Sequence, residues 1–307
     1  MYIRPVAAAA AAVLGLTLTV LGGAAGTAAA GSGTAAAASG AAAGSGGLTG
    51  PVVYAHRGAS AYAPENTLTA VDLAMLMGFT WVENDVQRTK DGELVVIHDD
   101  TLARTTDVET VFPNRRPWRV RDFTAAEISL LDAGSWFGEG YAGARVPTLR
   151  QYLDRVERNE QRLLLEIKKP ELYPGIEQQT LRVLEQAGWL DEDHVAYRLV
   201  VQSFSADSVR IVHDLHPDLV TAFLGTPAVA DLPAYARFTD RINPWHTTIS
   251  AEWVAAVHGL RGAHGKAMEV DTWIVDDKAT ARKVRDMGVD GIITNAPDVI
   301  REAVGGS

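Results

Sequence analysis

From Pro51 onward the sequence alternates short apolar runs with segments of helical periodicity, and this alternation restricts the folds open to the chain. Strands that alternate with helices are typical of a parallel sheet, in which each connection is long enough to carry a helix. The apolar runs predict strands at Val52–Ala55, Trp81–Val86, Leu94–Ile97, Leu163–Ile167, Leu199–Gln202, Val220–Leu224, Arg241–Asn243, Met268–Val275 and Gly291–Thr294. Helices are expected at Leu68–Met77, Leu149–Asn159, Ile176–Ala187, Ala206–His213, Ala251–His258 and Lys278–Met287. The length suits a (β/α)8 TIM barrel, which typically takes about 250 residues.

These runs supply one strand too many for the eight strands of a barrel. Leu94–Ile97 follows the Asp91-Gly92 pair, which is a strong signal for a tight turn. We therefore expect this run to form a hairpin with Trp81–Gln87, growing out of the second barrel strand. The segment 101–146, rich in Gly, Pro and Trp, then predicts an insertion on the barrel rim. The expected architecture is an α/β chain with a TIM barrel over residues 51–307 and a rim insertion after the strand-two hairpin.

The first fifty residues differ from the rest of the chain, because Arg4 is their only charged residue. The apolar run Val6–Leu21 and the small residues Ala28-Ala29-Ala30 follow it, in the order found in secretory signal peptides. The run is shorter than the about 20 residues that a membrane-spanning helix needs, which favours a cleaved signal over an uncleaved anchor. We predict a signal peptide over residues 1–30, a flexible Ala/Gly/Ser-rich linker over residues 31–50, and a secreted, extracellular protein. Association with the cell wall is left open.

The net charge and the lack of cysteine limit the partners and the chemistry that can be expected of the chain. The formal net charge of −10 repels phosphate backbones and anionic lipid, so nucleic-acid binding and membrane docking are not expected. The sequence has no cysteine, which excludes disulfides, thiolate metal sites and cysteine nucleophiles. The expected partner is a small molecule, and the sequence gives no indication of the oligomeric state.

Acidic residues occur within two of the predicted strands, where side chains two positions apart point to the same side. Glu83 and Asp85 share one face of the second strand, and Glu166 and Lys168 share one face of the strand Leu163–Ile167. The other face of that strand is apolar and should pack against helices, which turns the charged face into the barrel. Three carboxylates there repel one another and lose hydration, and a divalent cation such as Ca²⁺ or Mg²⁺ compensates both effects. The competing interpretation is that each acidic pair is a surface or ion-paired strand edge.

Two histidines follow apolar strands, and the active sites of these barrels lie at that end of the strands. His56 ends the first strand and His98 ends the hairpin, so both are candidates for general acid–base catalysis near the cation. Arg57 is suited to bidentate recognition of a phosphate. Glu65 and Asn66 precede a helix, and we expect Asn66 to be its N-cap. The remaining histidines are expected to be ordinary packed or surface residues: His194, His213, His216, His246, His258 and His264.

These residues, in this order, resemble the glycerophosphodiester phosphodiesterase family. The resemblance runs from Val53 to Asp298 and rests on the segments AHRGAS, PENTL, VENDVQRTKDGELVVIHDDTLARTT, LDAGSWF, VPTL, LLEIKKP, VQSF, TWIVDD and GVDGIITNAPD. The combination of HRG, PENT, TKDG and HD at these spacings is specific, although each motif alone is weak. The resemblance implies a barrel enzyme that hydrolyses a glycerophosphodiester to sn-glycerol 3-phosphate and an alcohol, using one divalent metal ion, often Ca²⁺ or Mg²⁺.

The resemblance also implies a role for each site residue. Its metal-binding carboxylates correspond to Glu83, Asp85 and Glu166, its acid–base histidines to His56 and His98, and its substrate- and phosphate-binding residues to Arg57, Lys168 and Trp273. The segment from Thr101 to Val146 corresponds to an insertion that shapes the substrate entrance in the family. Among the positions that depart from the family pattern, Asn84 replaces an apolar residue expected to face the helices. Asp276 replaces an asparagine near the mouth of the barrel.

Other functions remain open on the sequence. A phosphoinositide-cleaving phospholipase C also uses a barrel and two histidines, but bacterial members work without a metal, and the three carboxylates argue against it. A non-catalytic protein that binds phosphodiester polymers would not need the full set of histidines and carboxylates. A related secreted lipid phosphodiesterase, of phospholipase D or C type, is harder to separate. The sequence also leaves open the leaving alcohol, the metal, which histidine is the acid, and attack by water or by the glycerol 2-hydroxyl.

Overall fold

The structure of the chain, a computed structural model, describes residues 50–305. The predicted signal peptide and nearly all of the predicted linker lie outside the described residues. Among the helices that are described, none combines the length and the apolar character needed to cross a membrane.

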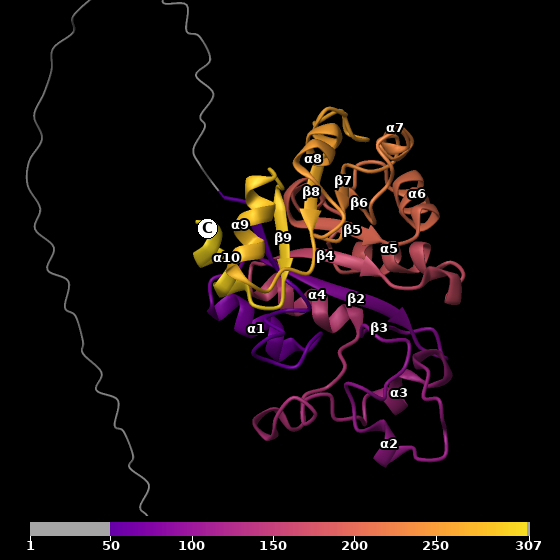
Figure 1. The fold of residues 1–307 in the computed structure, drawn as a ribbon. Coiled ribbons are helices and arrows are strands. Elements are labelled where there is room, and N and C mark those ends of the chain that lie inside the picture. Colours follow the sequence, from indigo (N-terminus) through magenta and orange to yellow (C-terminus); the bar gives the residue numbers. More distant parts are fainter. Residues whose placement is uncertain (1–49, 306–307) are drawn as a thin grey trace, which may run out of the picture. The chain divides into compact units, whose positions relative to one another are not determined.

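The barrel has eight parallel strands, as predicted (Figure 1). They are β1 (Val52–Ala55), β2 (Trp81–Arg88), β4 (Arg162–Ile167), β5 (Leu199–Ser203), β6 (Thr221–Leu224), β7 (Arg241–Asn243), β8 (Glu269–Thr272) and β9 (Gly291–Thr294). The sheet runs in the order β1, β9, β8, β7, β6, β5, β4, β2, and pairing of β1 with β2 closes it. The predicted hairpin is confirmed, because β3 (Leu94–Val96) pairs antiparallel with β2. β8 is shorter than predicted, since beyond Thr272 the pairing continues only as a bridge between Trp245 and Trp273.

Helices connect most of the strands. The longer ones are α1 (Leu68–Leu76), α4 (Leu149–Arg158), α5 (Ile176–Gln186), α6 (Ala206–Leu215), α8 (Ala251–His258), α9 (Lys278–Asp286) and α10 (Pro297–Val304). Single turns occur at α7 (Leu232–Tyr235), at the 3-10 turn Pro170–Leu172 and at the π-turn His194–Arg198. Five of the longer helices begin where a side-chain oxygen accepts a backbone N–H of the first turn, and the capping residues are Thr67, Thr148, Ser205, Ser250 and Asp277. α10 has no counterpart among the predicted helices and begins instead at Pro297, which suits a first turn because that position needs no N–H.

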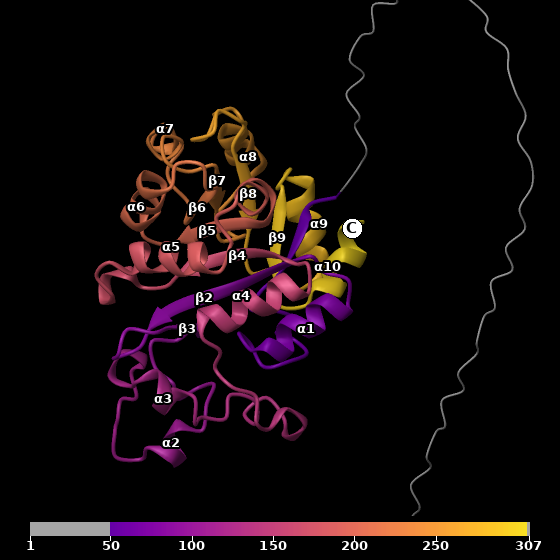
Figure 2. The same cartoon turned by 180° about the vertical axis from the view of Figure 1, so that it is seen from behind.

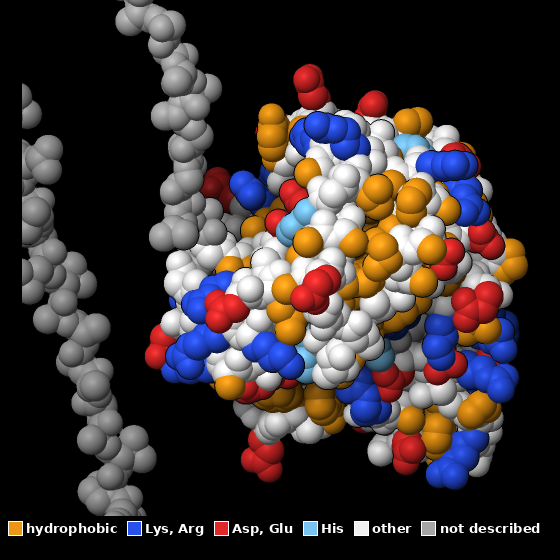
Figure 3. Space-filling view, turned by 45° about the horizontal axis from the view of Figure 1, so that its top comes forward, with side chains coloured by type: hydrophobic (Ala, Val, Ile, Leu, Met, Phe, Trp, Pro, Cys, Tyr) orange, Lys and Arg blue, Asp and Glu red, His pale blue; other side chains and the backbone are white. Residues whose placement is uncertain are grey.

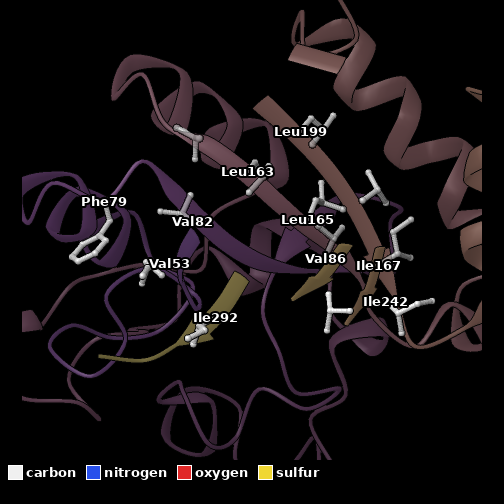
Figure 4. Close-up of a cluster of buried hydrophobic side chains, with 14 of the residues drawn as sticks. Val53, Phe79, Val82, Val86, Leu163, Leu165, Ile167, Leu199, Ile242 and Ile292 are labelled. Atoms are coloured by element: carbon white, nitrogen blue, oxygen red, sulfur yellow. The ribbon is translucent and has the colours of Figure 1, made fainter. Parts of the chain in front are cut away.

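The outward faces of the strands form the main hydrophobic core with the helices (Figure 4). Val53, Val82, Leu163 and Leu165 lie on this face, and burying a side chain of this size contributes about 1.5–3 kcal/mol. Asn84 is also fully buried in β2, and neither its amide oxygen nor its amide nitrogen has a hydrogen-bond partner. An unpartnered buried amide costs about 1–3 kcal/mol, so asparagine in place of an apolar residue weakens the packing of β2.

The rim insertion lies between β3 and β4 and has a small core of its own. It contains α2 (Val108–Val111), α3 (Ala125–Ile128) and the 3-10 turns Val120–Asp122 and Glu139–Tyr141. Its core includes Trp118, Phe123 and Leu131, together with apolar residues of the hairpin. Figures 1 and 2 both show α2 and α3 below the arrowhead of β2, at the end of the strand that the arrow points to. The insertion therefore lies toward the carboxyl end of the barrel strands.

Acidic and basic side chains share the surface. Figure 3 shows them interspersed with hydrophobic side chains on the face viewed there. Several of them form ion pairs, for example Lys278 with Glu302 and Arg210 with Asp207. Exposed pairs of this kind contribute about 0–1 kcal/mol each, so the stability of the barrel comes mainly from its buried parts.

The interior of the barrel has a polar plug at its amino-terminal end. Arg241 donates hydrogen bonds to the Tyr54 hydroxyl and to Asp271, and the carboxylate oxygen of Asp271 lies 2.9 Å from the guanidinium. Toward the carboxyl end an apolar layer follows, formed by Leu164, Val200, Ala222 and Ile293. The plug requires glycine at position 291 of β9, because a Cβ there would clash with the Asp271 carboxylate and lie 2.6 Å from the Tyr54 ring.

A Gly291→Ala variant is expected to lower the free energy of unfolding by about 1–3 kcal/mol, because the added methyl group overpacks the plug. Gly140→Ala is the matched control: a Cβ at Gly140 meets nothing within 4 Å, so its stability should stay within about 0.5 kcal/mol of the wild type. Chemical denaturation of both variants measures the difference, and equal stabilities would contradict the clash.

Candidate active site

A cavity of about 240 Å³ opens at the carboxyl ends of the barrel strands. Its polar side is lined by His56, Arg57, Glu83, His98, Glu166, Lys168 and Gln202, and its apolar side by Phe204, Leu224, Trp245, Trp273, Ile274 and Ile293. Asp85 lies behind the polar side, where it pairs with Arg57 and Lys168. Every residue predicted for the site therefore lies in or directly behind this cavity.

The three carboxylates predicted to bind a cation converge. Glu83 and Asp85 come from β2 and Glu166 from β4, and Asp85 and Glu166 are direct neighbours across the two strands. One oxygen from each residue lies within 4.8 Å of the others. The alternation of side chains along β4 explains the arrangement, because Leu163 and Leu165 point to the helices while Glu166 points inward.

Burial makes these acids electrostatically unequal. Burial and the charges of Asp85 and Glu166 hold the pKa of Glu83 well above its ordinary value. Burial and Asp85 raise the pKa of Glu166 to about 8, and Lys168 opposes only part of this shift. Although burial acts in the same upward direction on Asp85, the positive charges of Arg57 and Lys168 outweigh it and lower the pKa of that carboxyl. Asp85 is therefore the acid of the cluster that ionises most readily, whereas Glu83 and Glu166 resist ionisation.

The donor set fits a hard divalent cation. Asp85 Oδ1 is fully buried and accepts no hydrogen bond, and its nearest cation is Lys168 Nζ at 3.5 Å. An orphaned carboxylate oxygen beside two acids with raised pKa values is the situation that a Ca²⁺ or Mg²⁺ ion relieves. The acids are not a surface strand edge, because all three are buried, although Asp85 and Glu166 do form ion pairs with Arg57 and Lys168.

Arg57 owes its position to an unusual backbone. Its φ of 56° and the φ of 80° at Gly58 place two successive residues in the left-handed region, which costs energy at a non-glycine residue. In return the Arg57 backbone N–H donates to Glu83 Oε2 (3.0 Å), and its guanidinium reaches Glu65 (2.8 Å) and Asp85 (3.2 Å). A side chain at position 58 would collide with α1, since a Cβ there would lie 2.6 Å from the Ala70 backbone. The turn after β1 therefore contains an Arg-Gly pair that presents a guanidinium to the cavity.

The expectation that Asn66 caps α1 is wrong. Thr67 is the N-cap, and its hydroxyl oxygen accepts the N–H of Ala70. Asn66 has a φ of 59°, a left-handed conformation that asparagine tolerates better than most residues. Its amide Nδ2 donates to Asp85 Oδ2 at 2.8 Å, so Asn66 supports the carboxylate cluster. N-cap preference alone favours asparagine over threonine, so the sequence carries no signal for this shift by one residue.

His56 is held by an amide. Its Nδ1 lies 2.7 Å from Asn295 Oδ1, while the Asn295 Nδ2 and backbone N–H both donate to the carboxylate of Asp276. Because that carboxylate only accepts, the Asn295 oxygen must face His56, whose Nδ1 then carries the hydrogen. The Nε2 lone pair consequently points into the site, 3.8 Å from Glu83 Oε2. Burial and the charge of Arg57 lower the pKa of His56 to about 3, which keeps the ring neutral.

His98 is held by a carboxylate. Its Nδ1 lies 2.7 Å from Asp99 Oδ1, and Asp99 also accepts hydrogen bonds from Arg104. The buried Gln87 fixes the loop, because its Nε2 lies within 3.0 Å of the backbone oxygens of residues 97, 98 and 99. The two imidazoles thus enter one cavity with different partners behind them. Of the histidines in the described part of the chain, only these two line that cavity.

Aromatic rings form the opposite wall. Trp273, the predicted substrate-binding residue, lies 5.3 Å from the ring of Phe204 and 4.8 Å from the ring of Trp245, centroid to centroid. The Trp273 indole donates to the Asn243 carbonyl oxygen (2.7 Å), which fixes its orientation. Phe204 and Trp245 follow β5 and β7 in loops, where sequence periodicity gives no information about facing, so only Trp273 was expected here.

Comparison with known proteins points the same way as this geometry. The family described as "Glycerophosphoryl diester phosphodiesterase family" matches residues 56–299. A glycerophosphodiester phosphodiesterase of Bacillus subtilis is 34% identical over 265 residues, which cover 81% of this chain and 84% of that protein. One from Caldanaerobacter subterraneus is 34% identical over 259 residues, covering 81% of this chain and 96% of that protein.

A solved structure is also similar. It is an Oleispira antarctica phosphodiesterase in complex with the product sn-glycerol-3-phosphate. It is 27% identical, with a TM-score of 0.71, and the match covers 83% of this chain and 96% of that one.

Metal-free protein is expected to lose stability as the pH rises from about 5 to 8. The raised pKa of Glu166, about 8, means that the folded protein holds a proton that the unfolded chain releases above the ordinary value of 4.5. This contribution to stability is therefore present below pH 4.5 and lost toward pH 8, at about 1.4 kcal/mol per pH unit for one carboxylate.

Glu166→Gln should reduce this slope, because glutamine does not titrate, and the raised pKa of Glu83 accounts for the part that remains. Urea unfolding across the pH range, with chelator present throughout, measures it. Glu171→Gln alters an exposed acid and should leave the slope unchanged. A Glu166→Gln slope equal to that of the wild type would show that Glu166 is ionised in the metal-free folded protein.

Proposed function

The chain belongs to the glycerophosphoryl diester phosphodiesterase family, and we propose that it hydrolyses glycerophosphodiesters to sn-glycerol 3-phosphate and an alcohol by metal-dependent, two-histidine catalysis. The observation that carries the proposal is the convergence of three carboxylates, two imidazoles, a guanidinium and an ammonium on one cavity. The similar Oleispira structure supports the proposed product, because that enzyme is in complex with sn-glycerol-3-phosphate.

Glu83, Asp85 and Glu166 would hold one divalent cation, Ca²⁺ or Mg²⁺. When bound, such an ion supplies positive charge that polarises a phosphoryl oxygen. The acids with raised pKa values must release their protons to bind it, so the cation and the carboxylates stabilise each other.

Arg57 and Lys168 would bind the phosphate. Both side chains line the cavity, and both form ion pairs with the buried Asp85. Arg57 Nε lies 3.2 Å and Lys168 Nζ 3.5 Å from its carboxylate oxygens. Anchored in this way, the two cations are already oriented before the substrate arrives. They favour the negative charge that accumulates on the phosphate oxygens as the diester reacts.

The two imidazoles would move the protons. One accepts the proton of the attacking oxygen, and the other donates a proton to the oxygen of the leaving alcohol. The attacking oxygen belongs either to water or to the 2-hydroxyl of the glycerol, and both routes make the same demand on the histidines. The tethered Nδ1 atoms of His56 and His98 leave each Nε2 free for this work.

Purified protein is expected to release sn-glycerol 3-phosphate from a panel of glycerophosphodiesters whose alcohols are choline, ethanolamine and glycerol. An enzyme-coupled assay measures the release, which should cease after exhaustive chelation and return with Ca²⁺ or Mg²⁺. A Glu83→Gln variant should not recover at the metal concentration that restores the wild type. Full activity after chelation would contradict metal dependence, and no release from any diester would contradict the substrate class.

Replacing either His56 or His98 by alanine is expected to lower kcat for glycerophosphocholine by about 10²–10⁴-fold, because each removes a proton-transfer group. Steady-state kinetics measures the loss. His213→Ala is the control, since this histidine lies on α6 and does not line the cavity. Wild-type kcat in both cavity variants would contradict the two-histidine mechanism.

A further inference from the structure

An unbroken series of alternating charges runs across the mouth of the cavity from Arg57 to His98. Arg57 donates to Glu65 Oε1 (2.8 Å), and Glu65 accepts two hydrogen bonds from Arg104, both of 2.8 Å. Arg104 also donates to both oxygens of Asp99, at 2.7 and 3.0 Å, and Asp99 Oδ1 lies 2.7 Å from His98 Nδ1. Arg104 is thus the central member, with a two-bond contact on either side.

Arg104 is not in the cavity itself. It belongs to the rim insertion, and its side chain is 44% exposed. A half-exposed ion pair usually adds about 0–1 kcal/mol to stability, so a purely structural role would be a minor one. The geometry indicates something more specific, because a planar guanidinium that grips two carboxylates with two bonds each fixes their orientation. Asp99 is one of them, and it has a single short contact to the ring of His98.

The two histidines differ in the hydrogen-bond partner of their Nδ1 atoms. His56 faces a neutral amide oxygen of Asn295, whose orientation is fixed by Asp276. His98 faces a carboxylate that is itself fixed by Arg104. A neutral partner suits a ring that begins neutral and accepts a proton. A carboxylate stabilises the protonated form of a ring more than a neutral amide oxygen does, so of the two histidines His98 is the better suited to hold a proton and give it to the leaving alcohol.

We propose that Arg104 is a positioning residue which, through Asp99, holds His98 as the acid that protonates the leaving alcohol. The inference rests on the proposed function, since it assigns the two proton transfers of that reaction. His56 Nε2 takes the proton of the attacking oxygen as the new P–O bond forms. His98 Nε2 gives its proton to the leaving oxygen as the old P–O bond breaks. The enzyme then resets when His56 loses a proton to solvent and His98 regains one.

Two substrates with different leaving groups separate the protonation of the leaving alcohol by His98 from the other steps. The alkoxide of choline needs a proton as it departs, whereas 4-nitrophenolate departs without one. A defect in the acid therefore slows cleavage of glycerophosphocholine and largely spares the 4-nitrophenyl ester of glycerol 3-phosphate. A defect in folding, phosphate binding or the base slows both substrates alike.

The experiment compares kcat for the two substrates in Arg104→Met and Asp99→Asn. We expect each variant to lose about 10–10²-fold on glycerophosphocholine and less than about threefold on the nitrophenyl ester. His98→Ala should show the same contrast on a larger scale. His56→Ala should slow both substrates, which confirms that the chemical step limits the nitrophenyl reaction as well.

Arg150→Met is the matched control. Arg150 forms an ion pair of similar exposure with Asp154 on α4, and its loss should change neither rate. Arg104→Lys keeps the charge but not the planar fork, so it should fall between the wild type and Arg104→Met while remaining folded by thermal unfolding.

Equal losses on the two substrates, or no loss on either, in both Arg104→Met and Arg104→Lys would overturn the proposal. Failure of the wild type to cleave either diester would instead overturn the proposed function, so the two failures are distinguishable.

Discussion

Mutual repulsion among three buried carboxylates is the constraint that determines the arrangement of charged residues at the carboxyl ends of the barrel strands. Glu83, Asp85 and Glu166 could not share one small volume without nearby positive charge, and Arg57 and Lys168 provide it from the ends of two strands. The same need accounts for the left-handed backbone at Arg57, whose N–H and guanidinium both face acids. The energetic cost of this backbone conformation is offset because Arg57 then contacts both Glu83 and Asp85.

Polar partners also hold the two histidines in place, but the two partners differ in charge. An amide stands behind His56 and a carboxylate behind His98, and each partner is fixed in turn by a charged residue further out. These outer residues come from the loop after β8 and from the rim insertion, so parts of the chain far apart in sequence meet behind the two rings. The chemistry of the cavity therefore depends on loops as much as on strands.

The parity of β-strands explains why so much of the site could be predicted. Side chains two apart share a face, so the sequence alone places Glu83 with Asp85 and turns Glu166 inward once its apolar neighbours are assigned to the helices. No such rule exists for loops. Asn66, Arg104 and Asn295 act through contacts between segments distant in sequence, and nothing in their local pattern indicates the partner. α10 escaped prediction for a related reason, since it lacks a polar cap and follows directly on β9.

The apolar layer of Leu164, Val200, Ala222 and Ile293 separates the cavity from the Tyr54–Arg241–Asp271 plug. This layer offers no polar side chain between the two regions, so the ion pairs of the plug lie apart from the charged groups of the cavity. Substitutions in the plug should therefore change the stability of the fold with little effect on the groups that line the cavity. A thermostable form of the protein could accordingly be sought by redesigning the plug alone, leaving the reacting groups in their native surroundings.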